Sequence, residues 1–296
     1  MPGSSFREAS ARMRIAGLLD AGSFVEFLGP AQRACSPHLQ ALDLPAAFDD
    51  GVMVGRGRIA GQGLLLAAQE GSFMGGSVGE VHGAKITGLL ERAQHEKPAA
   101  VLLLVESGGV RLHEANAGLI AVSEIMRAVL STRTAGVPVL VLNGGQYGCF
   151  GGMSIVSRLC DAIIMSEEGR MGLSGPEVIE STCGVEEFDS RDRALVWRTV
   201  GGKHRYLTGD AAMLVEDDIA AFRAAVLRLI ASIKKPDLSL DALVAEHQRL
   251  GERLARFGGC SDALDIWRLL GAEAPESLPL MEIAEFLSLA GSRGRS

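Results

Sequence analysis

Through the middle of the chain, short apolar runs typical of strands alternate with segments whose apolar residues have helical spacing. Short apolar runs bounded by glycine or proline predict strands at 52–59, 64–69, 100–107, 138–143 and 162–166. Apolar residues recur at helical spacing over 77–96 and 114–134, and a short helix is expected after the 144–154 stretch. Because strands alternate with helices, the sequence predicts an α/β fold with largely parallel strand pairing.

The two ends of the chain lack this alternation. Residues 11–24 have helical spacing and end near a glycine, while residues 36–50 are mixed and predict a loop. Beyond about residue 186 the chain is mostly helical, and its last 25 or so residues form a weakly amphipathic tail. The helices expected there are 187–198, 215–233, 238–257 and 261–270. We therefore divide the chain into an N-terminal helix and loop (1–50), an α/β core (51–235) and a helical C-terminal extension (236–296).

Glycines gather where strands pass into helices. The clusters are EGSFMGGSVGE (70–80), SGGV (107–110) and GGQYGCFGGMS (144–154). Ligands of α/β folds tend to bind outside the carboxyl ends of the strands, where these clusters fall. Two backbone N–H groups that converge on one point would make an oxyanion hole. The alternative interpretation is that the glycines form tight turns and nothing more.

Composition and charge narrow the class of protein. Hydrophobic residues are 47% of the chain and the net charge is −7, which suits a soluble protein and argues against nucleic-acid binding. The five cysteines form no C-x-x-C pair and the six histidines no ligand pair, so no metal site is expected. The longest apolar runs are too short for a membrane helix, and the N-terminus carries no secretory signal. We expect a cytoplasmic protein with reduced thiols.

Some polar groups suggest further chemistry. GGKHRY (201–206) places Lys203 and Arg205 after two glycines, and with Arg56, Arg58 and Lys85 these residues could form a basic rim that contacts a phosphate. The alternative is a solvated loop. Ser154 lacks the G-x-S-x-G pattern of a nucleophile and is better read as a helix cap. Neither GAKIT (83–87) nor GRGRIAG (55–61) fits a phosphate-binding loop.

Five blocks in one order carry a resemblance to a known family. They are ARMRIAGLLDAGSFVEF (11–27), FMGGSVGEVHGAKI (73–86), ESGGVRLHEA (106–115), GGQYGCFGGMS (144–154) and MGLSGPEVIE (171–180). Together they resemble the carboxyltransferase beta-subunit family of acyl-CoA carboxylases over about residues 11–235, and within it the malonate decarboxylase branch. The chain departs from bacterial acetyl-CoA carboxylase beta subunits because it lacks their four-cysteine zinc ribbon.

The resemblance implies a crotonase-like (ClpP/crotonase) spiral of β-β-α units and half of an active site, completed by a related gamma subunit. It implies a malonyl thioester carried on the phosphopantetheine of an acyl carrier protein, with no cofactor bound directly. By position, Gly108 and Gly109 match one oxyanion glycine pair, and Gly151 and Gly152 match the second. Gly75, Gly76 and Ser77 match a segment that lines the acyl-thioester site.

The implied chemistry agrees with the residue types. Loss of CO₂ from a malonyl thioester leaves an enolate, which backbone donors would stabilise without a nucleophile or a metal. Tyr147, Cys149, His113 and water are all open as the proton donor. Three alternatives also remain open: a biotin-dependent carboxyltransferase subunit, a non-catalytic scaffold, and a hydratase that uses Glu106 or Glu114.

Overall fold

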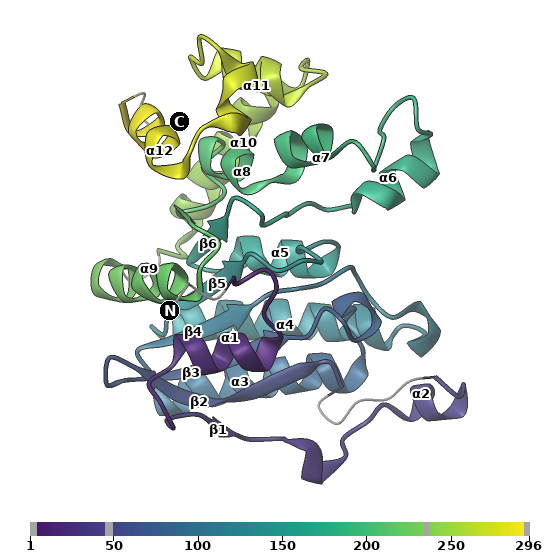
Figure 1. Cartoon of the computed structure of the whole chain (residues 1–296). Coiled ribbons are helices and arrows are strands. Elements are labelled where there is room, and N and C mark those ends of the chain that lie inside the picture. The colour runs from purple at the N-terminus through teal and green to yellow at the C-terminus, as the bar shows by residue number, and fades with distance from the viewer. Residues whose placement is uncertain (1–4, 45–49, 234–236, 293–296) are drawn as a thin grey trace.

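The computed structural model describes residues 5–44, 50–233 and 237–292, and its centre is one seven-stranded sheet (Figure 1). The strands lie in the order of the chain. The first three pair antiparallel, and the pairs from β3 to β7 are parallel. The strands are β1 Val25–Glu26, β2 Val52–Ile59, β3 Gln62–Gln69, β4 Ala100–Leu104, β5 Val139–Asn143, β6 Ala162–Ser166 and β7 Met213–Val215.

Helices cover both faces of the sheet (Figure 1). α3 (Glu80–Glu96) and α4 (Ala117–Thr134) pack on one face, and α1 (Ala11–Leu18) and α9 (Ile219–Ser232) on the other. Side chains of each central strand alternate between the two layers, so that Val101 packs with the first pair of helices and Leu102 with the second. Because both faces are buried, the central strands need continuous apolar sequences.

The remaining elements are short or peripheral. α5 is the next helix after β5, and the segment from α6 to α8 lies beyond the β6 end of the sheet (Figure 1). These elements are α2 Pro37–Ala41, α5 Gly152–Leu159, α6 Pro176–Cys183, α7 Arg193–Val200, α8 Gly202–Leu207, α10 Leu240–Phe257, α11 Ala263–Leu269 and α12 Ile283–Ser292, with 3₁₀ turns η1 Pro30–Gln32, η2 Met74–Gly76, η3 Leu112–Glu114 and η4 Pro275–Leu280.

Beyond the main sheet, the loops that leave its parallel strands pair with one another. Val78 bridges Val110, Ser107 bridges Cys149, and Cys149 also bridges Met171. After each of the strands β3 to β6, the chain therefore adds at least one residue to this small ladder before its next α-helix. The ladder holds the three glycine clusters side by side at the carboxyl ends of the strands.

The five predicted core strands and the helices that follow them are confirmed, with small shifts at their ends. The prediction of a loop over 36–50 missed the short helix α2, and residues 45–49 lie outside the described residues. The solvated-loop alternative for GGKHRY is wrong, because these residues form α8, in which Lys203 and His204 are buried. The three-part division stays a prediction. Trp267 and Phe286 of the C-terminal part join the same hydrophobic cluster as core residues such as Val141.

Candidate active site

The three glycine clusters meet in one place. The N–H of Gly108 donates to the carbonyl of Gly75 at 2.8 Å, and the N–H of Phe150 donates to the carbonyl of Ser107 at 2.7 Å. A Cβ atom added to Gly151 would lie 3.1 Å from the Cα of Gly109. The structure thus brings the predicted segments 75–77, 108–109 and 151–152 into direct contact.

Hydrogen bonding divides the four predicted oxyanion donors into two kinds. The N–H groups of Gly108 and Gly151 are occupied, the second by the carbonyl of Leu173 at 2.9 Å. Gly109 makes only a 3.4 Å contact with the hydroxyl of Ser107. Gly152 opens α5, and in the described part of the chain its N–H has no acceptor. The donors open to a ligand are therefore those of Gly109 and Gly152, one from each loop.

Four glycines of these segments, Gly75, Gly76, Gly109 and Gly151, have positive φ angles that favour glycine. Gly76 has φ +68°, and a Cβ there would overlap the carbonyl oxygen of Glu106. Gly109 has φ +137°, which side chains rarely tolerate, although the space around it is open. Ser77 closes the first segment by donating its hydroxyl to the carbonyl of Met74 at 2.7 Å. The glycine clusters therefore allow two backbone segments to come close together, and they also form turns.

A buried ion pair lies beneath the glycine loops. Arg14 of α1 donates to one oxygen of Glu106 at 2.5 Å, and both side chains are almost fully buried. The other oxygen of Glu106 accepts the N–H of Tyr147 at 3.0 Å. Arg14 is itself held by the carbonyl of Phe6. Glu106 therefore joins the loop that carries Gly109 to the loop that carries Gly152, and sequence reasoning gave it only a weak role in an alternative function.

A second buried network holds the other side of the 107–111 loop. Arg111 donates to the carboxylate of Asp50 at 2.7 Å and contacts that of Glu114 at 3.2 Å. Burial raises the pKa of Asp50, whereas burial next to Arg111 lowers the pKa of His82 to about 3. His82 is consequently neutral and shares a 2.9 Å hydrogen bond with Gln69, whose amide oxygen accepts the N–H of Glu106.

The proton-donor candidates fall into different positions. Cys149 is fully buried beside Ser157, and burial raises the pKa of its thiol to about 12, so it does not face a ligand. Tyr147 is 41% exposed. His113 is half-buried, and its Nε2 has no hydrogen-bond partner among the described residues. The prediction of Ser154 as a helix cap is wrong, because Gly151 is the N-cap of α5 and the Ser154 hydroxyl, inside the helix, donates to the carbonyl of Gly151 at 2.7 Å.

The two basic residues predicted to contact substrate differ in their surroundings. The Lys203 ammonium group contacts the carbonyls of Pro279 and Met281 and the carboxylate of Glu167. These partners use its three N–H donors, so Lys203 anchors the C-terminal part and has no donor left for a phosphate. Arg205 instead reaches the loop beside Gly151, where its Nε donates to the carbonyl of Met171 at 2.9 Å.

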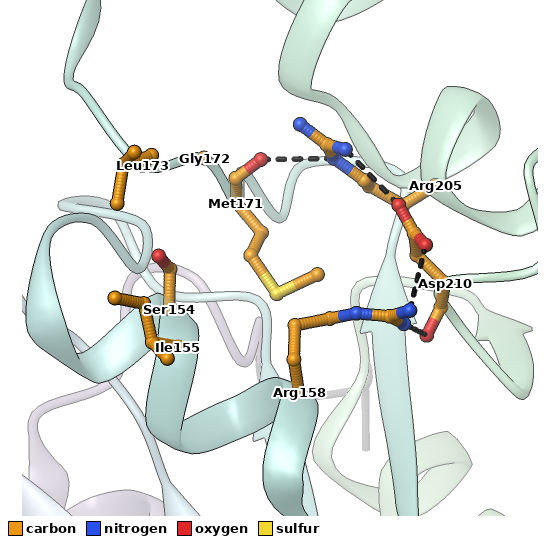
Figure 2. A pocket seen from close by; sticks show the side chains of 8 residues that line it. All are labelled: Ser154, Ile155, Arg158, Met171, Gly172, Leu173, Arg205 and Asp210. Carbon is orange, nitrogen blue, oxygen red and sulfur yellow. Dashed lines mark hydrogen bonds and ion pairs between the residues drawn. The ribbon is translucent and has the colours of Figure 1, made fainter. Parts of the chain in front are cut away.

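Arg205 lines a pocket next to the glycine loops (Figure 2). One wall is α5, with Ser154, Ile155 and Arg158, and the other is the 171–173 segment that accepts the N–H of Gly151. The pocket holds about 280 Å³. Asp210 closes it and pairs with both arginines, at 3.0 Å from Arg205 and 3.2 Å from Arg158.

Residues 5–44, 50–233 and 237–292 contain no group of three or more His, Cys, Asp or Glu side chains arranged to hold a metal ion. None of their helices has both the length and the apolar character needed to cross a membrane.

Comparison with known proteins identifies the family. A family model for the carboxyl transferase domain matches residues 8–249. The chain therefore belongs to the carboxyl transferase domain family, and the predicted family and crotonase-like fold are confirmed. The malonyl-S-ACP:biotin-protein carboxyltransferase of Malonomonas rubra is 42% identical, over 97% of this chain and 95% of the relative.

Solved structures give the same result. A chain of the Pseudomonas malonate decarboxylase hetero-tetramer, solved in complex with malonate, has a TM-score of 0.81 and 42% identity to this chain. The match covers 90% of this chain and 98% of that one. A chain of the Pseudomonas malonate decarboxylase hetero-dimer has a TM-score of 0.66 and 40% identity, over 83% and 96% of the two chains.

Proposed function

We propose that this chain is the beta-type subunit of a malonate decarboxylase and acts on a malonyl thioester carried by an acyl carrier protein. The observation that carries the proposal is the pair of donors on facing loops, Gly109 and Gly152, beside the supporting ion pair of Glu106. The family relationship and the two Pseudomonas structures support the same reaction class.

In the proposed reaction the thioester oxygen accepts hydrogen bonds from Gly109 and Gly152. The bond between the α-carbon and the carboxylate breaks and CO₂ leaves. The two electrons of that bond stay on the substrate and form the enolate. Protonation of its α-carbon then gives an acetyl thioester. Negative charge grows on the thioester oxygen during this step, so donors fixed in advance stabilise the transition state more than the substrate. One such donor is typically worth about 10²–10³ in rate.

We propose that a related gamma subunit completes the site. Large apolar side chains stand exposed on the segments that follow the glycines. Leu112 is 81% exposed and Leu173 is 68% exposed, and the others are Leu119, Ile120 and Val178. Covering apolar side chains of this size with a partner chain would remove them from water, which favours association. The Pseudomonas relatives are a hetero-tetramer and a hetero-dimer, which supports a heteromeric assembly.

One alternative has a specific observation in its favour. The Malonomonas relative is a malonyl-S-ACP:biotin-protein carboxyltransferase, so the same glycines could serve transfer of the carboxyl group to biotin. The two functions differ in the fate of CO₂ and share the enolate.

The test co-expresses the chain with its partner subunit and supplies malonyl-carrier protein, whose phosphopantetheine thioester is the proposed substrate. We expect acetyl-carrier protein and free CO₂ to form without any biotin protein. Turnover that depends strictly on a biotin protein would establish the alternative instead. A complex that assembles but converts the substrate in neither condition would leave the chain as a scaffold.

A further inference from the structure

Asp210 has more arginine partners than are needed to neutralise its single negative charge. Arg158, Arg205 and Arg253 all pair with it at 3.0 to 3.2 Å. Glu246 and Arg249 lie close enough to interact electrostatically with this group. Four guanidinium groups thus face two carboxylates, a surplus of positive charge in a chain whose net charge is −7.

Part of this excess positive charge lies at the wall of the pocket beside the glycine loops. Arg158 and Arg205 line that pocket, and Arg253 does not. Within the described residues Arg205 uses its Nε and one terminal nitrogen, while its other terminal nitrogen has no partner (Figure 2). Both oxygens of Asp210 are already taken by arginines, so the pocket offers donors and little negative charge.

The position of the pocket connects it to the proposed reaction. Its two walls are α5, whose first residue is the donor Gly152, and the Met171–Leu173 segment, whose last carbonyl fixes Gly151. A ligand with its thioester at the glycines would extend along α5 toward Arg158. Guanidinium groups bind carboxylate and phosphate oxygens strongly because their N–H donors form a planar fork.

We propose that Arg158 and Arg205 form an anion subsite that binds an oxyanion of the thioester substrate, either the phosphate of the carrier's prosthetic arm or the malonyl carboxylate. The subsite rests on the proposed function. It would hold the substrate in register with the two glycine donors, so it acts mainly on KM and less on kcat.

The test compares Arg158→Gln with Arg253→Gln in the assembled complex. Each substitution removes one ion pair to Asp210 of nearly equal length. Arg158 also donates to the backbone carbonyl of Asp210 at 3.2 Å, and of the two arginines only Arg158 lines the pocket. We expect Arg158→Gln to raise KM for malonyl-carrier protein about tenfold or more, as for loss of one charged hydrogen bond, with little change in kcat. Arg253→Gln should leave KM within twofold of wild type. Equal KM values for the two variants would overturn the subsite.

A second measurement does not depend on turnover. Inorganic phosphate should bind the wild-type complex, as followed by ³¹P NMR line broadening, and should bind Arg253→Gln equally but Arg158→Gln weakly. Unchanged phosphate binding in Arg158→Gln would overturn the subsite even if the complex is an active decarboxylase. If the complex is inactive, loss of phosphate binding in that variant still supports the anion site while the proposed function fails.

A truncated substrate then identifies the anion. Malonyl-pantetheine keeps the carboxylate and lacks the phosphate. If Arg158→Gln no longer raises KM with this substrate, the subsite binds the phosphate, and if the effect persists, it binds the carboxylate. Arg158→Lys should recover part of the lost affinity in either case, because the charge is restored without the fork.

Discussion

The carboxylate of Glu106 accepts the backbone N–H of Tyr147 at 3.0 Å and the guanidinium of Arg14 at 2.5 Å. It therefore connects both glycine loops to the first helix of the chain. The loops have few side chains of their own, so this carboxylate and the small ladder between Ser107, Cys149 and Met171 fix their relative position.

Replacing Glu106 with Gln should destabilise the protein strongly. The buried guanidinium of Arg14 would lose its countercharge, which typically costs about 3–5 kcal/mol. Urea unfolding of the complex measures this cost, and turnover should fall with it as the loops shift. The double variant Arg14→Met/Glu106→Gln should recover part of the stability. A double variant no more stable than Glu106→Gln alone would contradict this view of the pair.

Replacing Gly151 with Ala should damage turnover more than stability. Its φ of +63° would cost an alanine about 1–2 kcal/mol, and the new Cβ would push against Gly109. We expect kcat to fall by about 10² or more, because the two donors would separate. Gly136→Ala is the matched control, since φ is +81° there and no atom lies nearby. Equal loss of activity in both variants would remove Gly151 from the site.

Acid should destabilise the folded chain through its buried histidines. Burial lowers the pKa of His82 and of His204 to about 3, while their unfolded value is 6.5. Below pH 6.5 these two imidazoles are therefore protonated in the unfolded state and remain neutral in the folded state. Each histidine should remove about 1.4 kcal/mol of stability per pH unit as the pH falls toward 5.

Urea unfolding at several pH values measures this slope. His204→Gln should reduce it by the contribution of one proton, while the glutamine oxygen can still accept the Trp267 N–H that now reaches His204. A slope that is unchanged in this variant would show that His204 is protonated in the folded protein.

Replacing Lys203 with Met should affect stability and leave substrate affinity alone. The carbonyls of Pro279 and Met281 would lose their donor, at a cost of about 1–3 kcal/mol each. Limited proteolysis should then release the C-terminal part more readily. KM for malonyl-carrier protein should stay within twofold of wild type. A tenfold increase in KM would restore the substrate contact predicted from the sequence.

The core of the fold was predictable because each central strand has its own continuous apolar run. Helix α8 was not, since two glycines followed by Lys203 and His204 are typical of a loop. Burying that lysine becomes favourable only when carbonyls from 76 and 78 residues further along reach it. Local sequence carries no signal for such a contact.

The same limit applies to the site. The glycine clusters indicated where the chain bends, but not which N–H groups remain open. That depends on the cross-loop bonds of Gly108 to Gly75 and of Gly151 to Leu173. The pair of Arg14 and Glu106, 92 residues apart, likewise becomes visible only in three dimensions.

The anchors at the two ends of the chain have a consequence for biosynthesis. Arg14 reaches the glycine loops through Glu106, and Lys203 ties residues near 280 to α8, whose neighbour Gly201 bridges Arg170 beside those loops. A nascent chain that has not yet emerged to residue 281 lacks one of these attachments. Both attachments of the site can therefore form only after residue 281 has left the ribosome.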